Sequence, residues 1–203
     1  MHDRLETYRR KRDFQKTREP AGEQSKSDGG HRFVIQKHDA SRLHYDFRLE
    51  IDGVLASWAV PKGLSTDPRD KRLAMQTEDH PLDYIDFEGL IPEGEYGAGT
   101  VLVWDTGTYE NVLARKGGQR KGMQEALAEG LIEVWLEGEK LRGGYALKRI
   151  EGGKKPRWLV IKMNDEHADA RRRPTSTQPA SVKTGRDLDE VATQESGKGT
   201  QGA

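Results

Sequence analysis

The segment Leu43–Ile51 alternates strictly between apolar or aromatic residues and polar residues. Its polar members are His44, Asp46, Arg48 and Glu50. Successive side chains of a β-strand point to opposite faces, so a period of two predicts a strand that buries only one face. The opposite face of this strand then presents an imidazole, a carboxylate and a guanidinium in a row.

A second strand is predicted directly before it, at Phe33–His38, with a turn at Asp39–Arg42 between the two. If the strands form a hairpin, His38 ends close to the start of the second strand, where it can join His44 and Asp46. Two imidazoles and one carboxylate form an open metal site that leaves room for water or substrate. This donor set suits zinc, manganese or ferrous iron, and geometry rather than composition selects among them.

Arg48 lies one step further along the same predicted face. Its planar guanidinium binds pairs of phosphate or carboxylate oxygens, so a metal beside it indicates an anionic substrate, and we expect a phosphoryl group. A polar strand face without any metal is the competing interpretation, because His-x-Asp pairs on strands are commonly solvated or hydrogen-bonded to each other.

Composition limits how much of the chain can fold and where it can work. Of 203 residues, 33% are hydrophobic and 33% are charged, with a mean hydropathy of −0.91, so we expect disordered ends around a compact middle. The absence of cysteine excludes disulfides and thiolate metal sites. Without a bilayer-spanning apolar run or a signal peptide, a cytoplasmic protein with no membrane partner is expected.

Charge gives no general support for nucleic-acid binding, because 34 basic and 34 acidic residues leave a net charge of zero. Any such binding needs local segregation of charge. We predict three regions: a basic N-terminal arm and linker at 1–30, a β domain at 31–165 and a disordered polar tail at 166–203. The arm holds a predicted short basic helix at Leu5–Phe14, which ends before Pro20.

Many short strands separated by glycine turns are predicted in the middle region. After the hairpin they are Val54–Val60, Leu73–Thr77, Val101–Trp104, Leu131–Leu136, Leu141–Ile150 and Trp158–Met163. One short helix is predicted at Gly122–Glu129, and a turn at Asp105–Thr108. The glycine-rich segment Ile91–Thr100 lacks the Lys-Ser/Thr end of a phosphate-binding loop, so its glycines are interpreted as turn residues. This pattern favours an antiparallel barrel or sandwich.

The ordered motifs together resemble the 3′-phosphoesterase domain of the bacterial multifunctional ATP-dependent DNA ligase of non-homologous end joining. The resemblance extends from about Tyr8 to Ala168. The blocks that carry it are Lys11–Phe14, Thr17, Glu19–Pro20, Phe33–Glu50, Trp58–Gly63, Glu78–Tyr84, Ile91–Gly99, Trp104–Gly107 and Trp158–Lys162. The chain is too short to hold a ligase or polymerase domain as well, so we expect a stand-alone domain.

The resemblance implies a compact antiparallel β-barrel with one or two short helices and disordered tails. It implies a manganese-dependent enzyme, with zinc or cobalt as other divalent ions, that removes a 3′-terminal ribonucleoside and then the 3′-phosphate. The expected partners are DNA 3′ ends, together with a DNA ligase and other end-joining proteins, at the nucleoid.

The resemblance also implies roles for individual residues. The residues that would bind the metal are His38, His44 and Asp46. The residues that would hold the scissile phosphate are Arg48, His80 and Tyr84. The residues that would tune one or the other step are Gln36, Lys62, Arg72 and Glu78, with Arg12, Asp13 and Glu19 from the arm.

Two other functions stay open at the level of sequence. A two-histidine-one-carboxylate iron oxygenase would use His44, Asp46 and His80 as ligands, but it leaves Arg48 and His38 without a task. A non-catalytic DNA-end-binding module would use the same cluster only to position a phosphate.

Overall fold

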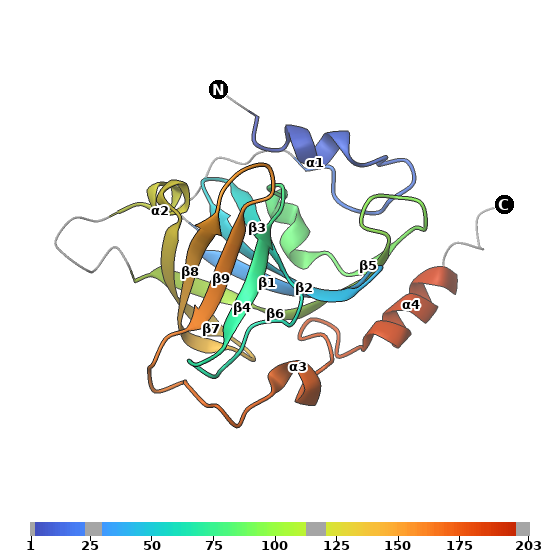
Figure 1. Ribbon diagram of the computed structural model, residues 1–203. Coiled ribbons are helices and arrows are strands. Elements are labelled where there is room, and N and C mark those ends of the chain that lie inside the picture. Colours follow the sequence, from blue (N-terminus) through green and yellow to red (C-terminus); the bar gives the residue numbers. More distant parts are fainter. Residues whose placement is uncertain (1–2, 23–29, 113–120, 198–203) are drawn as a thin grey trace.

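The computed structural model describes residues 3–22, 30–112 and 121–197. Eight of its strands close into an antiparallel barrel in the order β1-β2-β3-β4-β9-β8-β7-β6, and β6 pairs back with β1 (Figure 1). Their bounds are β1 Arg32–Asp39, β2 Leu43–Ile51, β3 Val54–Val60, β4 Lys71–Gln76, β6 Gly99–Asn111, β7 Leu131–Gly138, β8 Arg142–Glu151 and β9 Arg157–Lys162. The short β5, Gly89–Ile91, pairs with the start of β6. The predicted β-rich antiparallel barrel is confirmed.

The helices within the described residues are short. They are α1 Glu6–Arg10, the 3₁₀ helix η1 Leu82–Asp86, α2 Met123–Glu129, α3 Pro174–Thr177 and α4 Leu188–Gly197. The α2 helix is the one predicted inside the domain, and it ends at Gly130, whose φ of 84° is a left-handed cap. The chain thus has more helices than the one or two expected, because α3 and α4 form in the segment that was predicted to be disordered.

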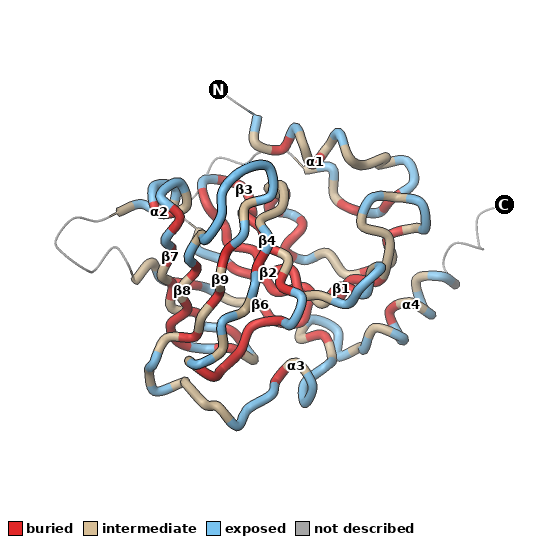
Figure 2. Tube along the Cα trace, in the orientation of Figure 1, coloured by how far each residue is buried: buried red, intermediate tan, exposed pale blue. Residues whose placement is uncertain are grey.

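The main core fills the inside of the barrel. The apolar face of β2 points into it, and Trp58, Trp104 and Trp158 are fully buried there. Figure 2 shows that many residues of the barrel strands are buried. The alternation in β2 follows from this geometry, since every second residue of a barrel strand faces the interior.

The polar face of β2 is also buried, which differs from the predicted half-buried strand. Asp46, Arg48 and Glu50 are 7%, 3% and 1% exposed. A second apolar cluster, which includes Tyr8 and Tyr84, lies outside the barrel and covers this face. Because the cover comes from distant parts of the chain, the pattern of β2 alone does not reveal it.

The strand β6 continues through the turn predicted at Asp105–Thr108 and ends at Asn111. Asp105 is fully buried, and its carboxylate accepts backbone hydrogen bonds from Glu139, Lys140 and Leu141. The aspartate therefore holds the β7–β8 connection instead of forming a turn of its own. The sequence Asp105-Thr106-Gly107 is also typical of a turn, so the local sequence does not distinguish a turn from this strand.

The segment 166–197 is ordered against the barrel, which corrects the prediction of a disordered tail for these residues. Trp104 Nε1 donates to the Gln178 carbonyl at 2.8 Å, and the Val182 amide donates to the Val103 carbonyl at 2.9 Å. Val191 of α4 is fully buried. These few contacts order a segment that is mostly polar, and its average composition therefore does not reveal them. The residues of the arm linker at 23–29 and of the last six positions lie outside the described part.

Within the described residues, no helix has the length and apolar character needed to cross a bilayer.

Candidate active site

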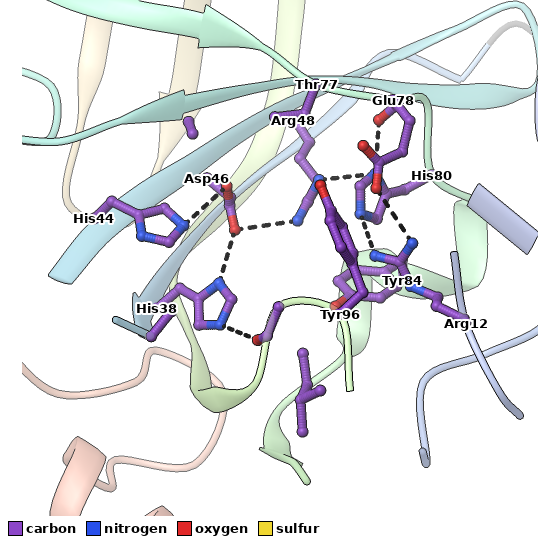
Figure 3. A pocket seen from close by; sticks show the side chains of 14 residues that line it. Arg12, His38, His44, Asp46, Arg48, Thr77, Glu78, His80, Tyr84 and Tyr96 are labelled. Carbon is purple, nitrogen blue, oxygen red and sulfur yellow. Dashed lines mark hydrogen bonds and ion pairs between the residues drawn. The ribbon is translucent and has the colours of Figure 1, made fainter. Parts of the chain in front are cut away.

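The β1–β2 hairpin assembles the predicted metal ligands. His38 lies opposite His44 in the register of the two strands, and Asp46 follows two residues later on the same face. The ligand atoms of the three side chains lie within 4.8 Å of one another. His38 Nδ1 is 3.4 Å from Asp46 Oδ2, and His44 Nε2 is 3.5 Å from Asp46 Oδ1 (Figure 3).

Each imidazole is oriented by its outer nitrogen. His38 Nε2 lies 2.8 Å from the Gly97 carbonyl oxygen, and His44 Nδ1 lies 2.9 Å from the Arg42 carbonyl oxygen. A carbonyl oxygen only accepts, so both outer nitrogens carry the proton in the neutral rings. The inner nitrogens then direct their lone pairs toward the Asp46 carboxylate. This arrangement fits a divalent cation between them, because metal-binding histidines regularly donate their second N–H to a carbonyl.

Arg48 is held on three sides. Its Nε donates to Gln36 Oε1 at 2.8 Å, its Nη2 lies 3.3 Å from Asp46 Oδ2, and its Nη1 lies 3.0 Å from His80 Nδ1. Gln36 in turn donates to the carbonyls of Tyr84 and Phe87. The guanidinium is thus fixed beside His38, His44 and Asp46, which we call the metal group. Arg48 is buried in this position, with 3% of the residue exposed. Burial opposes ionisation of Asp46, but the charge of Arg48 holds its pKa well below the usual range.

His80 lies between two guanidinium groups. Its Nδ1 lies 2.9 Å from the Glu78 carbonyl oxygen and 3.0 Å from Arg48 Nη1, and its Nε2 is 3.3 Å from Arg12 Nη2. The rings of Tyr8 and Tyr84 pack edge-on against it, with centroids at 5.0 and 4.8 Å. Burial, followed by the charges of Arg48 and Arg12, lowers the pKa of His80 well below its usual value, so the ring is neutral.

The same contacts exclude His80 from the metal group. Its nitrogens face arginines and not the carboxylate of Asp46, and the ligand cluster found among the described residues contains His38 instead. The structure therefore brings His38, and not His80, together with His44 and Asp46.

Tyr84 is anchored to the arm. Its Oη donates to Glu19 Oε1 at 2.8 Å, and Arg12 Nε donates to the same oxygen at 2.8 Å. Burial, together with the negative charge of Glu19, raises the pKa of Tyr84 well above its usual value, so the phenol stays protonated. Its ring lies 4.9 Å from the Arg48 guanidinium. In this geometry Tyr84 positions Arg48 and ties the arm to the barrel.

Glu78 joins two basic residues of the arm. Its Oε1 lies 3.2 Å from Arg12 Nη1, and its Oε2 lies 2.9 Å from Lys11 Nζ. Burial disfavours the charged carboxylate, but Lys11 and Arg12 outweigh it and lower the pKa of Glu78.

These side chains surround an open cavity of about 290 Å³. The predicted site residues that line it are Arg12, His38, His44, Asp46, Arg48, Glu78, His80 and Tyr84. Gln36 and Glu19 lie directly behind this lining, where they hold Arg48, Arg12 and Tyr84.

Three other predicted residues lie neither in the cavity lining nor directly behind it. Lys62 is exposed in the turn after β3. Arg72 pairs with Asp70 at 2.9 Å on β4. Asp13 is 3.4 Å from Lys16 on the surface of the arm. The structure gives them no contact with the metal group, and their roles stay predictions.

Sequence reasoning did not assign Tyr96 and Gly97 to the site, although both line the cavity. Gly97 has a φ of 78° and offers the carbonyl that orients His38. The glycine-rich segment was interpreted as turn residues only. A single aromatic residue among turn glycines was the available signal, because a turn by itself has no need of an exposed tyrosine.

Fold and site together define a small antiparallel barrel protein with a His-His-Asp group that could hold a metal ion beside a buried arginine. The chain belongs to the DNA ligase D 3′-phosphoesterase domain family, whose model matches residues 36–149. This confirms the resemblance found in the sequence.

Curated relatives support the same assignment. The chain is 52% identical over 167 residues to the multifunctional non-homologous end joining protein LigD of Pseudomonas aeruginosa. It is 47% identical over 165 residues to LigD proteins of Mycolicibacterium smegmatis and Mycobacterium tuberculosis. Each match covers 81% of this chain but only 19–21% of the relative, so the chain spans about a fifth of their length.

Proposed function

We propose that this chain is a divalent-metal-dependent phosphoesterase that processes DNA 3′ ends. It removes a 3′-terminal ribonucleoside and then the 3′-phosphate, which leaves a 3′-hydroxyl for ligation. The observation that carries the proposal is the placement of Arg48 on one cavity wall with the His38, His44 and Asp46 group. The proposed ion is manganese, with zinc or cobalt as the alternatives.

A bound divalent ion supplies Lewis acidity toward a phosphate oxygen and lowers the pKa of a bound water. The residues of the chain supply the rest of the chemistry. Asp46 stays ionised and, with His38 and His44, holds the ion. Arg48 offers guanidinium N–H groups that are already oriented, so they stabilise charge that develops on the phosphate oxygens without further reorganisation.

His80 and Arg12 are proposed to act on the opposite side of the phosphate. An anion that enters between Arg12 and Arg48 offsets the two charges that, together with burial, keep His80 neutral. The ring is then able to take up a proton and to return it to the leaving sugar oxygen. Tyr84 stays a protonated phenol and positions Arg48 and Glu19. Lys62, Arg72 and Asp13 are proposed to contact parts of the substrate outside the cavity.

The proposed setting is repair of DNA breaks in the cytoplasm, at the nucleoid. The relatives that contain this domain are end-joining proteins by name. A DNA ligase and other end-joining proteins are the proposed partners of the released 3′-hydroxyl.

The test is incubation of the purified protein and manganese with a primer-template that carries one 3′-terminal ribonucleotide. Resolution of the products by length and charge should reveal a 3′-phosphate intermediate and then a 3′-hydroxyl. Asp46→Ala should slow both steps by about 100-fold or more, because the metal loses a ligand. Asp39→Ala, at an exposed aspartate of the same hairpin, is the matched control.

Three outcomes would contradict the proposal. Most of the activity surviving in Asp46→Ala, with the bound metal unchanged, would refute the assignment of the ligands. Metal-dependent binding of the primer-template without any product would identify a non-catalytic end binder. Iron-dependent oxygen uptake without cleavage would indicate an oxygenase.

A further inference from the structure

The cavity lined by His38, His44 and Asp46 is called the metal cavity below, and a second, larger cavity adjoins it. Its volume is about 560 Å³, against about 290 Å³ for the metal cavity, and the two share Ala59, Thr77, Glu78 and Tyr96 in their linings. We call it the arm groove and define it by Arg4 and Lys11 of the arm, Glu78, Tyr96, and Lys154 and Lys155 of the β8–β9 loop. Figure 1 shows this loop at the same end of the barrel as α1.

Basic side chains dominate the arm groove. Lys154 and Lys155 are exposed and have no ion-pair partner among the described residues. Arg4 donates to Asp79, to the Ile51 carbonyl and to Gln124, and Lys11 donates to Glu78 and to the Tyr96 hydroxyl, so these two cations are already engaged within the chain. Four basic and two acidic side chains thus line the groove, which is the local segregation of charge that a neutral chain needs to bind a polyanion.

Tyr96 stands where the two cavities meet. It is 46% exposed, and Lys11 holds it in place with Nζ 4.4 Å from the ring centre and 3.1 Å from Oη. An exposed aromatic ring beside a basic groove is the arrangement on which proteins stack nucleic-acid bases.

Glu78 couples the two cavities. One carboxylate oxygen holds Arg12, which lines the metal cavity, and the other holds Lys11, which lines the arm groove. A ligand that fills both cavities therefore meets cationic groups along a continuous path.

We propose that the arm groove binds the nucleic-acid strand whose 3′ end lies in the metal cavity. The base of the terminal nucleotide stacks on Tyr96, and phosphodiesters on its 5′ side contact Lys154 and Lys155. This inference rests on the proposed function, because the reacting end is placed by the metal group. A polyphosphate strand fits the groove better than an acidic peptide, since the groove offers an aromatic platform as well as positive charge.

Binding is measured first, with a labelled primer-template that ends in a 3′-hydroxyl and so contains no scissile group. The double variant Lys154→Ala/Lys155→Ala should weaken the binding about tenfold and reduce the slope of log K against log salt by about 2, since each lysine contributes about 1. The matched control is Lys71→Ala/Lys148→Ala, at two exposed lysines that line neither cavity.

Turnover is measured next, on a series of substrates with one to ten nucleotides on the 5′ side of the reacting end. The KM of the wild-type protein should fall as the strand lengthens, and the KM of the double lysine variant should depend little on length. Tyr96→Ala should raise KM about tenfold, and Tyr96→Phe should restore it, because the ring and not the hydroxyl stacks on the base.

The outcomes separate this inference from the proposed function. Wild-type salt slope and wild-type length dependence in the double lysine variant would overturn the groove and leave the enzyme activity standing. If the wild-type protein makes no product, the proposed function fails. The binding measurement on the unreactive primer-template still tests whether the arm groove binds a nucleic-acid strand. If the Lys71→Ala/Lys148→Ala control lost as much affinity and salt slope, the effect would come from overall charge, and the inference about the arm groove would be overturned too.

Discussion

The chemistry of single residues depends here on which atoms are already engaged. Both outer imidazole nitrogens of the metal group donate to carbonyls, so the inner ones are free for a cation. Arg48 has one contact on each of its three nitrogens, which fixes its plane. His80 lies next to positive charge on two sides, and this environment determines its protonation.

The protonation of His80 predicts a pH dependence of stability. The native ring has a lowered pKa, whereas the unfolded ring takes up a proton near pH 6.5, so stability should fall as pH drops through that range. With metal chelated, the wild-type protein should lose about 1.4 kcal/mol more than His80→Gln between about pH 7.5 and about pH 5.5. Urea unfolding at both pH values measures this.

The matched control for this measurement is His31→Gln, at an exposed histidine that stacks on Tyr109 outside the cavity. An identical pH dependence in the wild-type protein and in His80→Gln would show that His80 is not held neutral.

Two elements build the site, the β1–β2 hairpin and the N-terminal arm. The hairpin supplies the metal group, and the arm closes the cavity with Arg12 and Glu19. The arm is attached by Leu5 and Tyr8, which are both fully buried, and by a hydrogen bond from Tyr84 Oη to Glu19 Oε1 at 2.8 Å. The arm is therefore a structural part of the site.

Removal of Arg12 should affect the whole arm. Arg12→Ala leaves the buried carboxylate of Glu19 without its cationic partner, which should cost about 3 kcal/mol of unfolding free energy. The cavity also loses one of the two guanidinium groups beside His80, so activity should fall as well. Denaturant unfolding and the primer-template assay measure the two effects.

Arg18→Ala provides the control within the same arm. Arg18 is 59% exposed and pairs with Glu195 at 2.7 Å, and an ion pair whose arginine is exposed to water is worth less than about 1 kcal/mol. If both variants lost the same stability, the buried position of Arg12 would have no special importance.

At the scale of the whole molecule, metal binding should be linked to folding. The hairpin that holds the metal group also forms part of the barrel, so the ion binds the native state and not the unfolded chain. Manganese at 100 times its dissociation constant should add about 2.7 kcal/mol to the unfolding free energy. Thermal and urea unfolding with manganese or with chelator measure the difference.

Asp46→Asn keeps the shape of the side chain but loses the charge, and it should abolish most of this stabilisation. Asp39→Asn, at the exposed end of β1, is the control that should retain it. An equal gain in both variants would place the ion elsewhere.

Local patterns were sufficient for the hairpin and the metal group. The period of two in β2 and the turn before it determine the strand register, and the register places His38 opposite His44. The same reasoning failed where contacts are distant. The turn assigned at Asp105 is a strand anchored by a loop 34 residues away, and the tail assigned as disordered is fixed by Gln178, Val182 and Val191.

The sequence alone determined the β-rich class, the hairpin and the donor set, because each of these follows from residues that are neighbours along the chain. Only the tertiary structure decided that the polar face of β2 is buried and that the arm lies over it. It also decided that His80 faces Arg12 and Arg48 instead of the metal group. These features depend on packing between segments more than 30 residues apart, such as Tyr84 against Glu19, and no periodicity within one segment encodes such packing.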